Sequence, residues 1–432
     1  MIALRRVADS SLLWVVGAGV LALGGGRFGR RAALRGLVSA GLASAVAQGP
    51  LRPLARNGPA SRPVTSALGF AVGAAQELPL TAAPLAGLAS AVAYSRVQRG
   101  VDDPGDVVAA AVIGTGIALA TRRLWPVAPH TPAETRRVFE PTMIDPSPEG
   151  DGVIVVVNSS AGPGGSCADE VRSELPHAEV IEIGGGDELE AALRDAVRRA
   201  LVVGVSGGDG SVNAAATLAA ENNKPLFVVP GGTLNHFAFA LGVMSVADAA
   251  EAVRVGRTVA VDRAVIDGHS FVNTASIGSY VDLVDARERL EDRIGKWPAM
   301  MVALVGVLRQ ADPVELELDG DLKRVWMIFI GNCRYHPAGF GPSWRERLDD
   351  GLLDIRIVHA SQPWSRTRLV ASVLAGRLAR CAVYEQRFVP SVRVRSLQGA
   401  LRLARDGETF DGSAEFTIDK AEEPLVVYVP KP

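Results

Sequence analysis

The distribution of apolar positions divides the chain into two parts suited to different solvents. Residues 1 to about 125 are dominated by Ala, Leu, Val and Gly, and their charges are confined largely to short arginine clusters. Five apolar stretches lie there, at residues 12–24, 33–47, 65–73, 80–94 and 107–121. Each is near or below the roughly 17–25 residues that a spanning helix needs, and abundant small residues are typical of close-packed membrane helices. We therefore predict an N-terminal α-helical membrane bundle over residues 1–125.

A soluble, alanine-rich bundle is the alternative for this part of the chain. It explains the composition less well, because almost no acidic residues interrupt the apolar stretches. A cleavable signal peptide fits less well too, because apolar segments recur far beyond the N-terminus. Arginines flank nearly every stretch, so the positive-inside rule gives no clean topology.

The rest of the chain has the pattern of a two-lobed protein. Residues 126–150 are rich in Pro, Thr and Glu and predict a linker. Short apolar runs at 153–157, 180–183, 201–205 and 226–229 then alternate with helical patterns such as 188–200. This alternation predicts an α/β lobe with a doubly wound parallel sheet over residues 151–257. From 258 to 432, alternating strands at 314–318, 325–330, 353–358, 392–394, 401–403 and 416–418 predict a β-rich, mainly antiparallel lobe.

Two glycine-rich turns carry the clearest chemistry. The first is Gly-Gly-Asp-Gly-Ser at 207–211, and the second is Pro-Gly-Gly-Thr at 230–233; each follows an apolar run and precedes a helix. Such turns let backbone N–H groups converge on an anion, and the helix N-terminus adds a positive dipole. One loop alone is as well explained by an ordinary capped turn. Two in successive strand-to-helix units indicate a nucleotide polyphosphate with its metal.

The residues expected at this nucleotide site share one sheet edge, where the carboxyl ends of parallel strands meet. Asp209 would hold Mg²⁺ on the phosphates, because this ion prefers one or two carboxylates plus substrate oxygens. The other expected nucleotide contacts are Asn158, Gly207, Gly208, Gly210, Ser211, Asn213, Gly231, Gly232, Thr233 and Asn235. Neither turn matches the Walker or dinucleotide patterns, which disfavours a P-loop NTPase or a simple dehydrogenase.

Composition narrows the choice of partner and compartment. The 45 basic and 47 acidic residues give a net charge of −2, so no bulk field argues for nucleic acid. The three cysteines, Cys167, Cys333 and Cys381, lack metal-ligand spacing and are interpreted as thiols in a reducing compartment. The positive mean hydropathy of +0.19 comes from the N-terminal part.

With these motifs in place, residues 151–430 resemble the catalytic domain of diacylglycerol kinases. The matching segments are the two glycine turns, Asn273, Ser276-Ile277-Gly278, Gly331-Asn332, the Leu-Asp-Asp-Gly-Leu-Leu-Asp stretch at 348–354 and Asp406-Gly407-Glu408. The resemblance implies an active site between the lobes, ATP and Mg²⁺ as cofactors, and Glu408 as catalytic base beside Asp209. It further implies a structural Mg²⁺ site at Asp349, Asp350 and Asp354. The chain departs from the family pattern at Ser159, Ala161, Leu234 and His236.

The N-terminal part resembles the type-2 phosphatidate phosphatase superfamily, whose members are membrane helical bundles. Ser95, Arg96 and Asp106 match its third motif, but Asp102 stands where the family has a nucleophilic histidine. The first histidine of the chain is His130, after the last apolar stretch. A histidine-nucleophile phosphatase cannot operate without an imidazole. We therefore interpret this part as an inactive, phosphatase-like membrane anchor.

These observations favour an ATP- and Mg²⁺-dependent lipid kinase acting on diacylglycerol or a related lipid. We expect it at the cell membrane, multi-pass, with the kinase domain on the cytoplasmic side and a lipid substrate as partner; a homodimer is compatible with the sequence. The main alternatives are an NAD kinase-like enzyme, which shares the first glycine turn, and a non-catalytic membrane-tethered nucleotide or lipid sensor. A bifunctional kinase–phosphatase is a weaker third option.

Overall fold

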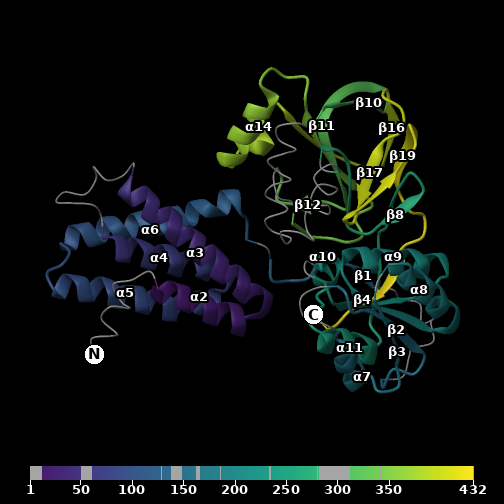
Figure 1. The fold of residues 1–432 in the computed structure, drawn as a ribbon, viewed down its shortest axis with the longest axis horizontal. Helices are drawn as coiled ribbons and strands as arrows, with labels where there is room; N and C mark the ends of the chain where they lie inside the picture. The colour runs from purple at the N-terminus through teal and green to yellow at the C-terminus, as the bar shows by residue number, and fades with distance from the viewer. Residues whose placement is uncertain are drawn as a thin grey trace. The chain divides into compact units, whose positions relative to one another are not determined.

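The computed structural model describes residues 12–49, 61–127, 129–137, 148–161, 166–184, 186–232, 235–279, 281, 312–339 and 343–431. The chain forms two compact units, Met1–Ala128 and Pro129–Pro432 (Figure 1). The first unit is helical, and the second combines an α/β lobe with a β-rich lobe.

The apolar stretches of the N-terminal unit are helical, as predicted, and the stretch at 80–94 spans η2 and α5. The helices are α2 (Leu12–Gly24), α3 (Gly26–Gln48), α4 (Arg62–Glu77), α5 (Ala82–Gln98) and α6 (Pro104–Leu124), with the short η2 (Pro79–Thr81) between α4 and α5. Glycines let the helices approach closely: a Cβ at Gly73 would lie 2.7 Å from Ser39 Oγ, and one at Gly114 would lie 2.6 Å from Thr65 O. The bundle therefore depends on small residues at its helix contacts.

The interior of this unit carries a buried ionic group. Arg35 on α3 and Glu77 at the end of α4 are 0% and 1% exposed, and Arg35 Nε donates to Glu77 Oε1 at 2.7 Å. The Arg35 guanidinium also stacks on the Trp125 ring, 4.6 Å from its centroid. Charges survive burial only when they are paired and hydrogen-bonded, as these are.

Its outer surface is apolar by contrast. Exposed large hydrophobic side chains are concentrated there and include Val16, Val20, Leu23, Val108 and Val112. Among the described residues, one helix (Pro104–Arg123) has the length and composition needed to cross a membrane, and 22% of it is buried inside the unit. This unit thus buries the Arg35–Glu77 pair and presents many valine and leucine side chains outward.

The α/β lobe contains the predicted parallel sheet. Its strand order is β1-β6-β20-β5-β4-β2-β3, and the strands from β20 to β3 run parallel. The strands are β1 (Arg136–Arg137), β2 (Val153–Asn158), β3 (Glu179–Ile183), β4 (Val202–Gly207), β5 (Leu226–Pro230), β6 (Thr258–Val261) and β20 (Leu425–Tyr428). The helices of this lobe are α7 (Ala168–Glu174), α8 (Asp187–Arg199), α9 (Asp209–Glu221), α10 (His236–Ala240) and α11 (Val246–Val255).

Two boundaries differ from the sequence interpretation. Strands β6 and β20 belong to the α/β sheet, although residues 258–432 were expected to form the other lobe. Strand β1 lies inside the expected linker at 126–150 and pairs with β6. The local pattern shows that a strand is apolar and buried, but not which of two sheets it joins.

The β-rich lobe is antiparallel throughout its described pairings, and its strands run from teal through green to yellow in Figure 1. Its large sheet contains β7 (Ala264–Ile266), β8 (His269–Phe271), β9 (Thr274–Gly278), β10 (Val314–Leu318), β11 (Asp321–Asn332), β14 (Leu353–His359), β15 (Tyr384–Val389), β16 (Ser391–Ser396), β17 (Arg402–Arg405), β18 (Glu408–Asp411) and β19 (Glu415–Lys420). A small sheet pairs β12 (Tyr335–His336) with β13 (Trp344–Arg345), and α14 (Ser365–Leu374) and η3 (Leu378–Arg380) follow β14.

The C-terminal strand β20 lies between β6 and β5, so the α/β sheet is completed by residues far along the chain from its other strands. We expect removal of residues 425–432 to abolish cooperative unfolding of the kinase unit, because Leu425 and Val427 are fully buried between neighbouring strands. Circular dichroism during heating of the full-length chain measures this. Removal of residues 431–432 alone is the control and should leave the transition in place; an unchanged transition in the longer truncation would contradict the role given to β20.

Candidate functional site

The two glycine turns are built against each other. They follow β4 and β5, which are parallel neighbours with Gly207 opposite Pro230. A Cβ at Gly231 would lie 2.5 Å from Ser206 Oγ and 2.9 Å from Gly207 N. A Cβ at Gly232 would lie 2.5 Å from Gly208 Cα. Only glycine fits where two backbones touch in this way, so the turns form one surface at the carboxyl end of the sheet.

Asn235 fastens the second turn. Its Oδ1 accepts a hydrogen bond from Gly232 N at 2.8 Å, and its Nδ2 donates to Gly232 O at 2.8 Å. Asn235 itself has a left-handed backbone with φ of 49°, a conformation that asparagine tolerates better than most residues. Its amide holds the turn in shape, and its neighbour Thr233 lies outside the described residues.

Three further predicted residues flank the first turn. Asn158, at the end of β2, donates through Nδ2 to Ser211 Oγ at 3.2 Å. Ser211 in turn faces Gly207, where a Cβ would lie 2.6 Å from the serine Cβ. Asn213 is 2% exposed and donates to Ser270 O at 3.1 Å, so it ties α9 to β8 of the other lobe. Asn158 and Ser211 are thus brought to the turn, and Asn213 serves the contact between lobes.

Asp209 begins α9 directly after Gly208. Its Oδ1 lies 3.4 Å from both Phe237 N and Asn273 Nδ2, which are long contacts with neutral donors. In the part of the chain that the structure describes, no basic side chain pairs with this carboxylate. A half-buried carboxylate without a cationic partner, at a helix N-terminus beside phosphate-binding turns, is suited to a Mg²⁺ ion.

Glu408 reaches the same turn from the other lobe. It is the first residue of β18, and its Oε1 lies 2.6 Å from the position of a Cβ at Gly210. The β17–β18 hairpin that carries it turns at Asp406 and Gly407, with φ values of 43° and 91°. Two positive φ angles are typical of a type I′ turn, for which Asp-Gly is a preferred sequence. The structure therefore brings together the two predicted catalytic residues, Asp209 and Glu408, at one glycine turn.

Asp406 anchors this hairpin to the strand that faces Asp209. Its carboxylate accepts backbone N–H groups of Val272 at 2.9 Å, Asn273 at 3.0 Å and Thr274 at 2.8 Å. Burial raises the pKa of Asp406 to about 7, and the three amide donors oppose that rise. Asn273, held in this way, presents its Nδ2 to Asp209.

Arg345 on β13 supports the same residue. It donates to Asn273 Oδ1 at 3.0 Å and to Val272 O at 2.7 Å, and it is 5% exposed. The role of Arg345 is not predictable from the sequence, because nothing in its local sequence distinguishes it from the arginine at 347. Asp406 and Asn273 lie in quoted motifs, but their supporting role also depends on contacts between distant segments.

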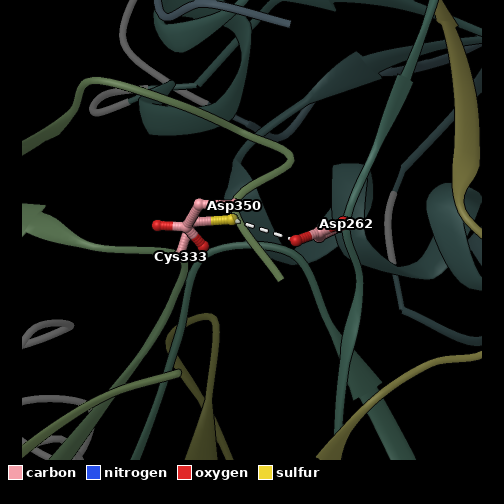
Figure 2. Close-up of side chains that lie close together, drawn as sticks. All are labelled: Asp262, Cys333 and Asp350. Carbon is pink, nitrogen blue, oxygen red and sulfur yellow. Dashed lines mark hydrogen bonds between the residues drawn. The ribbon is translucent and has the colours of Figure 1, made fainter. Parts of the chain in front are cut away.

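The three aspartates expected to hold a structural metal do not gather. Asp349 pairs with Arg347 at 2.9 Å, and the fully buried Asp354 pairs with Arg356 at 2.7 Å. The alternation along β14 places Asp354 and Arg356 on one face, so a cation within the strand already neutralises this carboxylate. Asp350 instead lies with Asp262 and Cys333, their ligand atoms within 4.8 Å of one another (Figure 2).

The chain is similar to several known proteins. The model of the diacylglycerol kinase catalytic domain matches residues 152–266. A diacylglycerol kinase of Bacillus subtilis (strain 168) is 30% identical over 200 residues, which cover 44% of this chain and 66% of that protein. A "Probable lipid kinase YegS-like" protein of Pseudomonas syringae pv. syringae (strain B728a) is 32% identical over 245 residues, which cover 54% of this chain and 76% of that protein.

The fold also matches a solved structure. A solved structure of a protein from Bacillus anthracis str. Sterne aligns with 65% of this chain and 98% of its own, at 20% identity and a TM-score of 0.50. This similarity supports the two-lobed architecture of the second unit.

The contact between the turns gives a matched pair of substitutions. We expect Gly232→Ala to lower the free energy of unfolding by about 1–3 kcal/mol, because its Cβ meets backbone atoms of the facing turn. Gly208→Ala is the control: its Cβ has nothing within 4 Å and its φ is −76°, so the loss should stay below about 1 kcal/mol. Thermal or urea unfolding of both variants measures the difference, and equal losses would contradict the interlocked turns.

Proposed function

Because this chain belongs to the diacylglycerol kinase catalytic-domain family of lipid kinases, we propose that it transfers the γ-phosphoryl group of ATP to the hydroxyl of diacylglycerol or a related lipid alcohol. One observation carries the proposal. Asp209 and Glu408 come from different lobes, and both stand at the glycine turn where phosphates would bind.

The glycine turns supply the phosphate contacts. Backbone N–H groups at the start of α9 would donate hydrogen bonds to the phosphate oxygens of ATP. Gly207, Gly208, Gly231 and Gly232 have no side chains, so they would let the phosphates approach the backbone. Asp209 is the residue that would hold Mg²⁺, since its carboxylate has no basic partner among the described residues. When bound, this ion would neutralise charge on the transferred group.

Glu408 is placed to handle the proton of the acceptor. As the lipid oxygen forms its bond to the γ-phosphorus and the bond to the ADP oxygen breaks, a carboxylate beside the turn takes the hydroxyl proton. Its neighbour Asp406 fixes the hairpin by three backbone hydrogen bonds, so Glu408 approaches Gly210 from a rigid element. Asn273 and Arg345 act by positioning, because they orient the segment that faces Asp209.

An NAD kinase-like activity is the rival that shares the first glycine turn. The lipid kinase relatives align over 245 residues, beyond the nucleotide lobe, and so favour a lipid acceptor. A sensor without turnover would have no need of Glu408 beside Gly210.

The activity is tested with radiolabelled ATP, Mg²⁺ and a panel of lipid alcohols in mixed micelles, with NAD as the competing acceptor. We expect label in phosphatidate or a related lipid phosphate. Glu408→Gln and Asp209→Asn should each lower kcat by at least about 100-fold, since each removes a group that acts on the transferred phosphoryl or its acceptor.

Asp411→Asn is the matched control for Glu408. Asp411 ends the same strand, its side chain is 85% exposed, and it forms an ion pair with Arg402 at 2.8 Å. Its activity should stay near that of the parent chain. Full activity of Glu408→Gln in a folded protein would contradict the catalytic role, and labelled NADP would replace the lipid proposal with its rival.

We further propose that the N-terminal unit anchors the kinase in the cell membrane as a multi-pass bundle, with the kinase on the cytoplasmic side where ATP is available. The support is its polarity: Arg35 and Glu77 are buried together, while large apolar side chains cover the outside. In water that arrangement is costly, whereas hydrocarbon suits an apolar exterior. The ion pair of Arg96 with Asp102, at the position of the missing histidine, supports an inactive phosphatase-like role.

Membrane anchoring predicts that the same substitution at two equally exposed positions has different effects on membrane retention. Val112 on α6 and Leu322 on β11 are each 68% exposed. We expect Val112→Asp to reduce the fraction of protein that stays in membranes after a carbonate wash, because a charge in hydrocarbon costs about 2–4 kcal/mol. Leu322→Asp should leave that fraction unchanged. Complete extraction of the unsubstituted chain by carbonate would contradict an integral anchor.

A further inference from the structure

Lys420, the last residue of β19, reaches into a group of acceptors from separate parts of the chain. Its Nζ lies 3.1 Å from Asp262 Oδ2, donates to Asn332 Oδ1 at 2.5 Å and lies 3.5 Å from Cys333 Sγ. The lysine side chain is only 13% exposed. An ammonium thus sits where acceptors from the end of β6 and the end of β11 converge.

This group is the one place among the described residues where three metal-ligating side chains meet. Figure 2 shows Asp350 and Cys333 together on one side and Asp262 facing them. Asp262 Oδ2 also accepts Gly351 N at 2.8 Å, while Asp350 accepts Arg334 N at 3.0 Å and Leu352 N at 2.9 Å. The carboxylates therefore already have donors from the protein.

The chemistry of the group does not suit Mg²⁺. This ion takes hard oxygen ligands in a near-octahedral arrangement. Cys333 is fully buried, and its sulfur is a soft atom that does not suit this hard ion. Asp349 and Asp354, the other aspartates expected to bind the ion, already form ion pairs with Arg347 and Arg356.

We propose that the Lys420 ammonium supplies the positive charge that the family resemblance assigns to a structural Mg²⁺ ion, so that this chain holds the junction of its two lobes without a bound metal there. A divalent cation is then needed only with the nucleotide. The proposal rests on the geometry of Lys420 and does not depend on the proposed kinase activity.

The position of Lys420 explains why a cation matters there. Lys420 contacts Asn332. The Asn332 side chain donates to Asp262 O at 2.7 Å, and its backbone carbonyl accepts from Arg345 at 3.2 Å. Arg345 in turn orients Asn273, which faces Asp209. Lys420 is therefore a positioning residue: it joins the segment after β6 to the network that reaches the glycine turns.

The test is the response of nucleotide-free, full-length protein to divalent cations. After treatment with a chelator, the parent chain should show the same Tm with and without millimolar Mg²⁺ or Ca²⁺. Lys420→Met leaves Asp262 without its cation, so its Tm should fall by about 5 °C or more, and Mg²⁺ or Ca²⁺ should restore part of the loss. Lys420→Arg keeps the charge and should stay insensitive to both ions.

The control is Lys323→Met, which removes another lysine of the β-rich lobe, paired with Glu385 at 3.5 Å. Its Tm should not respond to either ion. A rise in the Tm of the parent chain with Mg²⁺ that Asp262→Asn abolishes would overturn the proposal.

If Lys420→Met fails to fold, a second measurement tests whether a metal binds at Asp262. Electron paramagnetic resonance measures Mn²⁺ binding to the parent chain in the absence of nucleotide. The proposal is supported if no Mn²⁺ binds, or if Asp262→Asn leaves the bound Mn²⁺ unchanged. One bound Mn²⁺ that Asp262→Asn removes overturns it.

Discussion

The site depends on the direct contact between the backbones of two turns. Strands β4 and β5 are parallel neighbours, so the turns that follow them emerge side by side, and the spacing leaves no room for a Cβ at Gly231 or Gly232. A surface of backbone N–H groups forms as a result, with Asp209 at its edge on the first residue of α9. Glu408 and Asn158, from other elements, also contact the first turn, at Gly210 and Ser211.

In the β-rich lobe, protein groups compensate the buried carboxylates that lie near the site. The buried Asp406 accepts three backbone N–H groups and thereby fixes both Asn273 and the hairpin of Glu408. Elsewhere in this lobe each buried carboxylate meets a protein cation, as Asp354 meets Arg356. Asp209, half-buried in the α/β lobe, has neither a basic partner among the described residues nor a set of short amide donors like that of Asp406, since its two hydrogen bonds are 3.4 Å long. Buried charges are stable only when compensated, so an uncompensated one marks a place for a ligand.

The N-terminal unit follows the opposite rule of polarity from the kinase unit. The α/β lobe buries valine strands such as β2 and exposes charged helices such as α8, whereas the N-terminal helices bury Arg35 with Glu77 and expose valine and leucine. One chain therefore carries two units with opposite surface polarity, and this contrast is the basis of the proposed membrane anchor.

The sequence by itself determined the helices, the parallel and antiparallel lobes and the glycine turns, because these follow from local periodicity and from the absence of a glycine side chain where backbones approach closely. It did not determine that β6 and β20 join the α/β sheet, that Arg345 orients Asn273, or that Asp350 faces Asp262 and Cys333 rather than Asp349 and Asp354. Those outcomes depend on contacts between segments far apart in the chain. Local sequence specifies which face a side chain occupies, and only the packed structure decides what lies opposite it.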